Sequence, residues 1–513
     1  MLGISQIKWL CMIGVLAMVG SSMACKTTEA TDTDTERSYQ QYLSQRHALM
    51  ASDSALYFDR EIQLNEKEMQ LNKRLIGLQQ SMIQDYKANH FFPPARNFYQ
   101  SKEHIEGTEL FDILRKMPKG GILHLHLSAM GDATWLIERA INTPEMHVYW
   151  QEESDDYTKG QLHAYHPGQA PTGFFPAADL DARVMNFRDS LRSFITFDEK
   201  IDRDSVDIWG NFEDIFQRID GFVMYKPVWV DHLVHGLNIL IGDNIQHAEL
   251  RVPFFNTLYE LDRPANITAM AEYVETLVEV KRHIEKIDPE FTLNIIHANL
   301  RFFDEETIWQ DIQFTHQNRA KYPEWVRGYD LVAEEDAGNA TLYHSNNFLK
   351  LDSLERVSGT SLPLYLHDGE SDWASVDNLY DAVLLGTRRI GHGFNLFRFP
   401  KLLDLVREKN ICMEINPLSN QILGYVRDLR IHPASTYLRR GIDCTISSDD
   451  PLIFDYQGLS YDYWSIFLAW ELDLAALKKL SRNSITHSAM TKDEKIKALA
   501  VWEKRWEHFV TSN

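Results

Sequence analysis

The stretch GGILHLHLS at residues 120–128 decides the fold. It is a short apolar run with His124 and His126 near its end, and side chains two positions apart on a strand share one face. Seven similar runs of β-branched or apolar residues follow, and each ends in polar residues. The eight candidate strands are residues 122–127, 245–252, 293–300, 326–332, 364–367, 389–393, 411–415 and 444–447.

Helical patterns separate most of these strands. They cover residues 270–287, 377–385, 399–409 and 432–440. Such βα alternation is typical of a parallel sheet, and eight βα units predict an α/β fold closed as a TIM (β/α)8 barrel. We place the barrel at residues 98–513. The largest excess of chain lies between the first two strands, where polar residues at about 146–198 predict an insertion after the first strand.

The N-terminus predicts export. Lys8 precedes an apolar run at residues 9–20 that is too short to span a membrane. The following Ser22-Met23-Ala24-Cys25 predicts a signal peptide over residues 1–24. Cys25 and the polar linker at residues 25–38 also resemble a bacterial lipoprotein signal, although Ser22 stands where such signals usually carry Leu. Plain cleavage, lipidation of Cys25 and a retained apolar helix stay open, so we expect an extracellular, periplasmic or lipid-anchored protein of a bacterial envelope.

Residues 39–97 predict a helical N-terminal extension. This segment is rich in Leu, Met, Gln and charged residues near helical spacing, and the pattern ends before Pro93-Pro94. Nothing catalytic is visible in it. Because such a region packs on its own domain or on a partner subunit, we expect a dimerisation region and a homodimer.

Composition excludes several classes of protein. The chain has 513 residues, 44% of them hydrophobic, and a formal net charge of -22. This content excludes disorder of the whole chain and nucleic-acid binding by a general basic surface. The four cysteines form no Cys-x-x-Cys pair, and we expect Cys412 and Cys444 to be buried thiols.

Polar residues that carry chemistry follow four of the predicted strands. The first strand ends in His124 and His126, and the others end in HDGE at 367–370, GHG at 391–393 and SDDP at 448–451. Each fragment alone has an ordinary explanation, such as a turn for Asp449-Asp450. In a barrel, however, the C-terminal ends of all strands meet at one mouth. Three His and one Asp from three strands therefore predict a site for one divalent ion with room for water.

Six longer motifs make the pattern specific. They are HLH at 124–126, RIGHGF at 389–394, NPLSNQIL at 416–423, RDLRIHP at 427–433, ISSDDP at 446–451 and GLSYDYW at 458–464. In this order they resemble the metal-dependent adenosine deaminases of the amidohydrolase superfamily, most closely the secreted, growth-factor-type branch. The resemblance covers residues 117–506, and the branch also carries a signal peptide, a helical dimerisation region and an insertion after the first strand.

The resemblance implies a role for each matching position. It implies hydrolytic deamination of adenosine or 2′-deoxyadenosine to inosine and ammonia, with hydroxide at one Zn2+ per chain attacking C6. Glu370 would protonate the ring, and His392 with Asp449 would orient or deprotonate the water. Asp450 would bond the purine, and Trp209 would form an aromatic wall. The implied zinc ligands are His124, His126, His367 and Asp449.

Three departures from the family pattern affect the substrate. Leu127 and Ser128 stand where the family has an Asp beside the ribose, which puts sugar recognition in doubt. Ala333 replaces a Gly whose backbone N–H meets the purine, so its Cβ narrows the approach. The HDGE motif has Asp368 where the family usually has Ala, which adds a charge near the metal.

Other functions remain as alternatives. His247-Ala248-Glu249 matches the His-x-Glu of nucleobase deaminases, but no Pro-Cys-x-x-Cys follows it. A two-metal amidohydrolase would need a Lys on the fourth strand, and residues 326–335 contain none. An amidohydrolase acting on another 6-aminopurine or a different small substrate stays open, as does an exported, non-catalytic nucleoside-binding protein.

Overall fold

The computed structural model describes residues 32–198, 207–253, 258–262 and 270–513. The chain divides into two units, residues 1–54 and residues 55–513. The described part of the first unit is one helix, α1 (Asp32–Ser54). Residues 32–38, which we assigned to a polar linker, are therefore helical. The predicted signal peptide at 1–24 and Cys25 lie outside the described residues.

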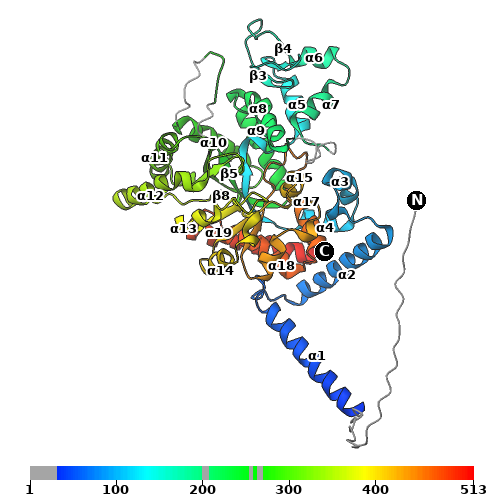
Figure 1. Ribbon diagram of the computed structural model, residues 1–513. Helices are drawn as coiled ribbons and strands as arrows, with labels where there is room; N and C mark the ends of the chain where they lie inside the picture. The colour runs from blue at the N-terminus through cyan, green and yellow to red at the C-terminus, as the bar shows by residue number, and fades with distance from the viewer. Residues whose placement is uncertain (1–31, 199–206, 254–257, 263–269) are drawn as a thin grey trace, which may run out of the picture. The chain divides into compact units, whose positions relative to one another are not determined.

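Eight parallel strands in the second unit form the barrel (Figure 1). Two four-stranded sheets, ordered β1-β5-β6-β7 and β8-β9-β10-β11, meet through isolated bridges between Tyr329 and Leu364 and between Leu125 and Asp449. These two bridges close the ring, which confirms the predicted α/β barrel. The strands are β1 (Gly120–His126), β5 (Ile245–Val252), β6 (Thr292–Leu300), β7 (Val326–Val332), β8 (His367–Asp368), β9 (Arg389–His392), β10 (Cys412–Ile415) and β11 (Cys444–Ile446).

Helices connect successive strands, as the predicted alternation requires. Local capping chemistry starts α11 (Glu305–Lys321), because the Asp304 side chain accepts a hydrogen bond from the Thr307 N–H. Figure 1 shows these helices around the strands. The helices between strands are α10 (Met270–Ile284), α11 (Glu305–Lys321), α12 (Thr341–Ser358), α13 (Leu379–Leu385), α14 (Pro400–Glu408), α15 (Pro417–Ile422) and α16 (Ala434–Arg439). The helices that follow the last strand are α17 (Ser460–Ala469), α18 (Leu474–Thr486) and α19 (Lys492–Ser512).

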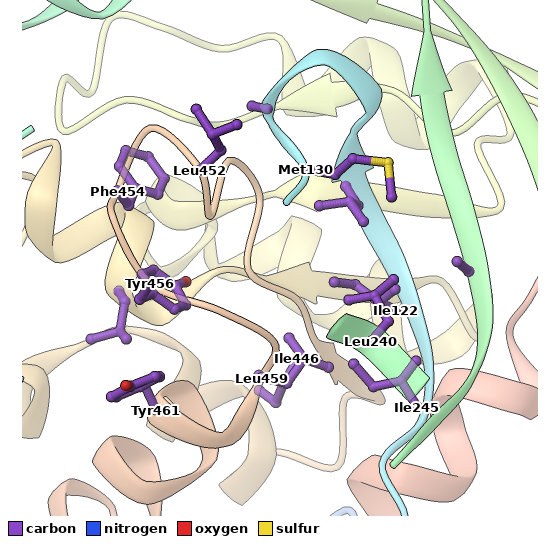
Figure 2. Close-up of a cluster of buried hydrophobic side chains, with 14 of the residues drawn as sticks. Ile122, Met130, Leu240, Ile245, Ile446, Leu452, Phe454, Tyr456, Leu459 and Tyr461 are labelled. Atoms are coloured by element: carbon purple, nitrogen blue, oxygen red, sulfur yellow. The ribbon is translucent and has the colours of Figure 1, made fainter. Parts of the chain in front are cut away.

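Apolar packing holds the seam between the first and last strands. Figure 2 shows Ile122 of β1, Ile245 of β5 and Ile446 of β11 in one buried cluster with side chains of the segment after β11. Each of these three isoleucines is at most 1% exposed. Burial of one such side chain contributes roughly 1.5–3 kcal/mol. The Leu452 N–H also donates to the Ala129 carbonyl at 2.8 Å, so the segment after β11 is fixed against the segment after β1.

The long connection between β1 and β5 contains a separate lobe, as expected for the predicted insertion (Figure 1). Its strands β2 (Met146–Tyr149), β3 (Leu162–Ala164) and β4 (Phe174–Pro176) form an antiparallel sheet in the order β3-β2-β4. Strand β3 packs closely on α8 (Ile208–Val223) at Gly221, because a Cβ there would collide with the Leu162 carbonyl oxygen. The helices of the connection are α5 (Ala133–Ile141), α6 (Ala177–Arg183), α7 (Phe187–Ile195), α8 (Ile208–Val223) and α9 (Lys226–Gly242).

Three helices precede the barrel in the second unit: α2 (Glu66–Asn89), α3 (Phe98–Glu106) and α4 (Glu109–Lys116). Helix α2 packs on the barrel's last helices, because its Gln79 Nε2 donates to the Phe467 carbonyl at 2.7 Å. A short 3-10 turn at Pro93–Ala95 follows α2, where the helical pattern ended in the sequence. Dimerisation through this region stays a prediction. Within the described residues, no helix is long and apolar enough to cross a membrane.

Candidate active site

Imidazoles and carboxylates converge at the mouth of the barrel. His124 and His126 end β1, His367 lies in β8, His392 ends β9, and Asp449 follows β11. The Asp449 Oδ1 lies 3.1 Å from His124 Nε2 and 3.3 Å from His126 Nε2. Two overlapping sets of side chains could hold a metal ion. One is His124, His367, His392 and Asp449, with ligand atoms within 4.8 Å of one another, and the other is His126, Asp449 and Asp450.

Carboxylates behind two of these histidines decide which ring nitrogen faces the mouth. His124 Nδ1 lies 2.8 Å from Glu414 Oε2, and His367 Nδ1 lies 2.7 Å from Asp330 Oδ2. Both carboxylates accept, so both Nδ1 atoms carry the proton and both Nε2 atoms keep a lone pair. The two Nε2 atoms and Asp449 Oδ1 are buried without a hydrogen-bond partner among the described residues. Buried polar atoms of this kind require a partner, and a metal ion fits the donor set.

A buried network of charges lies beneath the site. Arg251 donates to Glu414 at 2.7 Å and to Asp330 at 3.1 Å. Arg389 donates to Glu414 and to Glu249, each at 2.5 Å. All five side chains are fully buried, so the two guanidinium groups compensate the carboxylates that orient the histidines. Sequence reasoning missed Glu414 and Asp330, although both lie on predicted strands.

Burial and charge separate the protonation behaviour of the site's carboxyl groups. Burial raises the pKa of Glu370 well above its usual range, and Asp449 and Glu335 raise it further. Burial also opposes ionisation of Asp449, but His392 and His124 lower its pKa well below the usual range. The pKa of Asp450 is raised well above its usual range by burial and by Asp449. The site therefore favours one ionised carboxylate beside two neutral carboxyl groups.

A chain of hydrogen bonds supports His392 from behind. The Ala434 N–H donates to His432 Nδ1 at 3.1 Å, which leaves His432 Nε2 as the donor to Asn420 Oδ1 at 3.0 Å. The Asn420 amide then lies 3.2 Å from His392 Nδ1 and donates to it. This direction gives His392 its proton on Nε2, which lies 3.6 Å from Asp449 Oδ2. Asn420 and His432 belong to the NPLSNQIL and RDLRIHP motifs, whose role the sequence alone did not reveal.

Backbone geometry at the mouth is unusual. The non-glycine residues His392, Asp449 and Ala333 have φ values of 59°, 64° and 83°, in the left-handed region. Such conformations cost about 1–3 kcal/mol each and are concentrated at functional sites. Beside them, a Cβ at Gly391 would lie 3.1 Å from His124 Cε1, so glycine allows the imidazole to pack closely.

The polar cluster opens into a pocket of about 370 Å³. The predicted substrate contacts Ser128, Trp209, Ala333 and Asp450 line it, together with His126, His367, Glu370, His392 and Asp449. His124 lies beneath it and is fully buried. The pocket thus unites residues that are far apart in the sequence.

Helix α8 of the insertion forms one wall of this pocket. Trp209 was predicted there, and its Nε1 donates to the Tyr425 hydroxyl at 2.9 Å. Sequence reasoning missed the rest of this wall. One signal in the sequence could have identified this wall, because positions on the same helix face as Trp209 recur at fixed spacings. These spacings are i+3, i+4, i+7, i+8 and i+11 from Trp209. The missed residues are Phe212, Glu213, Phe216, Gln217 and Asp220.

The sequence predicted that Asp368 of the HDGE loop adds a charge near the metal, and the structure differs from this prediction. Asp368 Oδ1 accepts from Thr341 Oγ1 at 2.5 Å, and Asp368 belongs to neither metal-binding set. Burial and Glu335 raise its pKa well above the usual range, which favours the neutral carboxyl. Glu335 itself accepts from the Glu370 N–H at 2.6 Å and so positions the loop.

Two other sequence features are structural. His247 Nε2 lies 3.1 Å from Glu249 Oε1 inside the buried network, so this His-x-Glu pair belongs to the barrel interior. Cys412 and Cys444 are buried free cysteines, as predicted.

Family models and curated relatives match most of the chain. The model described as adenosine deaminase matches residues 240–502, and the one described as adenosine/AMP deaminase N-terminal matches residues 11–114. Adenosine deaminase 2 of Homo sapiens is 33% identical over 479 residues, which is 91% of this chain and 92% of the relative. Adenosine deaminase 2 of Dictyostelium discoideum is 33% identical over 476 residues, or 92% of this chain and 87% of the relative.

Solved structures share the fold at low sequence identity. The apo N6-methyl-AMP deaminase of Arabidopsis thaliana has a TM-score of 0.55 at 15% identity and covers 77% of this chain and 98% of its own. A Burkholderia ambifaria amidohydrolase with bound Zn has a TM-score of 0.57 at 16% identity, covering 79% and 96%. With the matching family models and relatives, these findings show that the chain belongs to the adenosine deaminase family, whose enzymes are hydrolases acting on C–N bonds.

Proposed function

We propose that this protein is a zinc-dependent enzyme that deaminates adenosine or 2′-deoxyadenosine to inosine and ammonia. The observation that carries this proposal is the cluster of buried, unpartnered ligand atoms at the pocket floor. His124 Nε2, His367 Nε2 and Asp449 Oδ1 all lack hydrogen-bond partners among the described residues. Neutral imidazoles and an ionised carboxylate are the ligands that zinc prefers.

We assign the zinc ligands as His124, His126, His367 and Asp449. His126 and His392 both lie close enough to Asp449 for this role. The Asn420 amide lies 3.2 Å from His392 Nδ1 and the Asn416 amide lies 3.3 Å from its Nε2, so amide groups contact both ring nitrogens, and we assign this imidazole to the water rather than to the metal. When bound by these residues, a zinc ion would lower the pKa of water to about 7.

The remaining residues fit proton transfer and purine binding. A neutral Glu370 at the pocket wall can donate its proton to the N1 acceptor of adenine. His392, with Nε2–H directed at the Asp449 side, holds the attacking water in line. A neutral Asp450 can donate to the N7 acceptor, and Trp209 provides an apolar face for the ring.

The charge of the pocket favours a nucleoside over a nucleotide. Glu213 and Asp220 of α8 line it and oppose a phosphate. Arg251 also lines it, but that guanidinium is already paired with Asp330 and Glu414. Related structures were solved with IMP and GMP, which are 6-oxopurine nucleotides and correspond to the product side of such a deamination. Another 6-aminopurine, including a nucleotide, is therefore the alternative substrate class. A non-catalytic nucleoside-binding protein would not need the proton-donating Glu370.

We also propose that the protein is exported, with a signal peptide at residues 1–24 and either a free or a lipidated Cys25. A homodimer through the N-terminal helices belongs to the same proposal. Mass spectrometry of the mature N-terminus separates the two forms of Cys25, and sedimentation of the purified chain gives the oligomeric state.

A substrate panel tests the proposed activity. Purified, zinc-loaded protein is mixed with adenosine, 2′-deoxyadenosine, adenine and AMP, and the absorbance change from aminopurine to oxopurine is followed. We expect turnover of the two nucleosides and at least tenfold lower kcat/KM for AMP, because of Glu213 and Asp220. Turnover of AMP in preference to adenosine would move the proposal to a nucleotide deaminase.

A further inference from the structure

A second cavity, of about 550 Å³, lies at the opposite end of the barrel from the active site. Its lining residues stand where strands begin: Tyr365 precedes β8, Arg388 precedes β9, and Ile411 precedes β10. The segment between α18 and α19 and the first turn of α19 close it from the other side. The active site lies where the same strands end, so the two cavities are separate.

The charge of this cavity is opposite to that of the chain. Its lining contains Arg388, Lys409, Lys495 and His487 but no Asp or Glu. The whole chain has 74 acidic residues against 52 Lys and Arg. A cavity with three cations and no carboxylate is therefore a local exception in an acidic protein, and we call it the basic cavity.

Within the described residues, Arg388, Lys409 and Lys495 form no ion pair, whereas His487 pairs with Asp443 at 3.0 Å. Within the described residues, the side chains of Arg388 and Lys495 have no hydrogen-bond or ion-pair partner. Lys409 Nζ donates to the Val383 carbonyl at 3.3 Å. Cations nearby behave differently, since Lys479 pairs with Glu61 at 2.7 Å and Arg327 with Glu494 at 2.7 Å.

A buried guanidinium, paired with Glu249 and Glu414, lies beneath the cavity. The Arg389 Cζ lies 4.0 Å from the centre of the Tyr365 ring, which lines the cavity. Burial lowers the pKa of Lys495, and although Glu249 opposes this, Arg389 and Arg388 lower the pKa further. Arg388 and Lys409 are exposed and Lys495 is half-buried, so their like charges repel one another across the cavity, and a bound anion would reduce this repulsion.

We propose that the basic cavity binds a small phosphate-type oxyanion, either free phosphate or the phosphate group of a small sugar phosphate. The Arg388 guanidinium offers a fork of N–H donors that matches two phosphate oxygens. Lys409 and Lys495 supply point charges, and Tyr365 forms part of the wall. The cavity has the size of a ligand site, which leaves room for a sugar beside the phosphate.

Calorimetric titration of the full chain tests this site. Inorganic phosphate and ribose 5-phosphate are titrated separately at low ionic strength in a phosphate-free buffer. We expect one saturable site per chain for at least one of them, with tighter binding of ribose 5-phosphate if the sugar is recognised. Arg388→Ala with Lys495→Ala should weaken that binding at least tenfold.

Two controls make the result decisive. Lys401→Ala removes an exposed cation of α14 that does not line the cavity and should leave the affinity unchanged. Adenosine turnover by the double variant should equal that of the wild type, because no catalytic group changes. The proposal is overturned by the absence of saturable binding of both anions, or by equal binding to the wild type and the double variant. Neither result bears on the deaminase proposal, which the substrate panel tests separately.

Discussion

The two layers of polar side chains inside the barrel differ in how completely their atoms are partnered. In the lower layer, Arg251 and Arg389 pair with carboxylates at 3.1 Å or less. In the upper layer, at the mouth, His124 Nε2, His367 Nε2 and Asp449 Oδ1 have no hydrogen-bond partner among the described residues. The paired side chains of the lower layer orient the histidines, and the unpartnered atoms of the upper layer are available to a ligand.

The largest effect should come from the upper layer. Glu370→Gln keeps the shape of the side chain but removes the proton that the neutral acid can donate. We expect kcat for adenosine to fall by about 10²–10⁴-fold, the range typical of a general acid. Bound zinc and the melting temperature should stay as in the wild type, because Glu370 is not an assigned ligand. Full activity of this variant would contradict the mechanism.

A substitution in the lower layer should lower the affinity of the site for zinc. Glu414→Gln removes the charge that accepts from His124 Nδ1 and that compensates Arg251 and Arg389. We expect zinc affinity to fall about 10–100-fold. The free energy of unfolding should fall by about 3–5 kcal/mol, because two buried cations lose a partner.

A matched control separates this effect from a general loss of charge. Glu408→Gln changes an exposed glutamate of α14 and should leave both quantities unchanged. Competition with a chelator measures the affinity, and urea unfolding measures the stability. Wild-type zinc affinity in Glu414→Gln would show that the lower layer does not orient the ligands.

Acid should lower the stability of the protein through His432, which supports His392 from behind. Burial lowers the pKa of His432 to about 3, whereas an unfolded His titrates near 6.5. Between these values the unfolded chain binds a proton that the native chain does not, so stability is complete above pH 6.5 and falls as the pH drops toward 3. The slope from this residue is at most about 1.4 kcal/mol per pH unit.

Urea unfolding at pH 7 and pH 5 measures this slope. His432→Asn cannot titrate, so we expect its stability to change less between the two pH values than that of the wild type. His232 also has a pKa lowered by burial, to about 4, so part of the acid sensitivity should remain in the variant. Identical pH dependence in both proteins would mean that His432 is accessible to protons in the native state.

The sequence predicted the upper layer far better than the lower one. His367 and His392 lie near the ends of predicted strands and Asp449 follows one, and a barrel brings all strand ends together. Glu414 and Asp330 lie within apolar strands, where no local pattern distinguishes a buried ion pair from a residue facing solvent. Their partner Arg251 is far away in the sequence, and such pairing appears only when the barrel closes.

The strands themselves were predicted closely because β-branched runs bounded by polar residues are a local signal. The short strand β8 (His367–Asp368) is the exception, since its predicted beginning at Leu364 pairs only through a single bridge to Tyr329. The wall from α8 was only partly predicted, because a helix face shows its spacing but not what it faces.

The smallest effect should come from Ala333 at the rim of the pocket. Its φ of 83° is strained for an alanine, and glycine adopts it freely. We expect Ala333→Gly to raise the free energy of unfolding by about 1 kcal/mol or less and to lower KM for adenosine by widening the approach. Ala500→Gly on the exposed face of α19 should instead lower stability by about 1 kcal/mol. A loss of stability in both variants would argue against strain at Ala333.

Zinc titration of the metal-free protein tests the central claim most directly. The released ammonia is measured with adenosine as substrate while zinc is added in steps. The account predicts that activity rises linearly, stops at one zinc per chain, and yields one inosine for each ammonia. A protein that binds one zinc per chain but deaminates neither adenosine nor 2′-deoxyadenosine, or one that needs two ions per chain for activity, would contradict it.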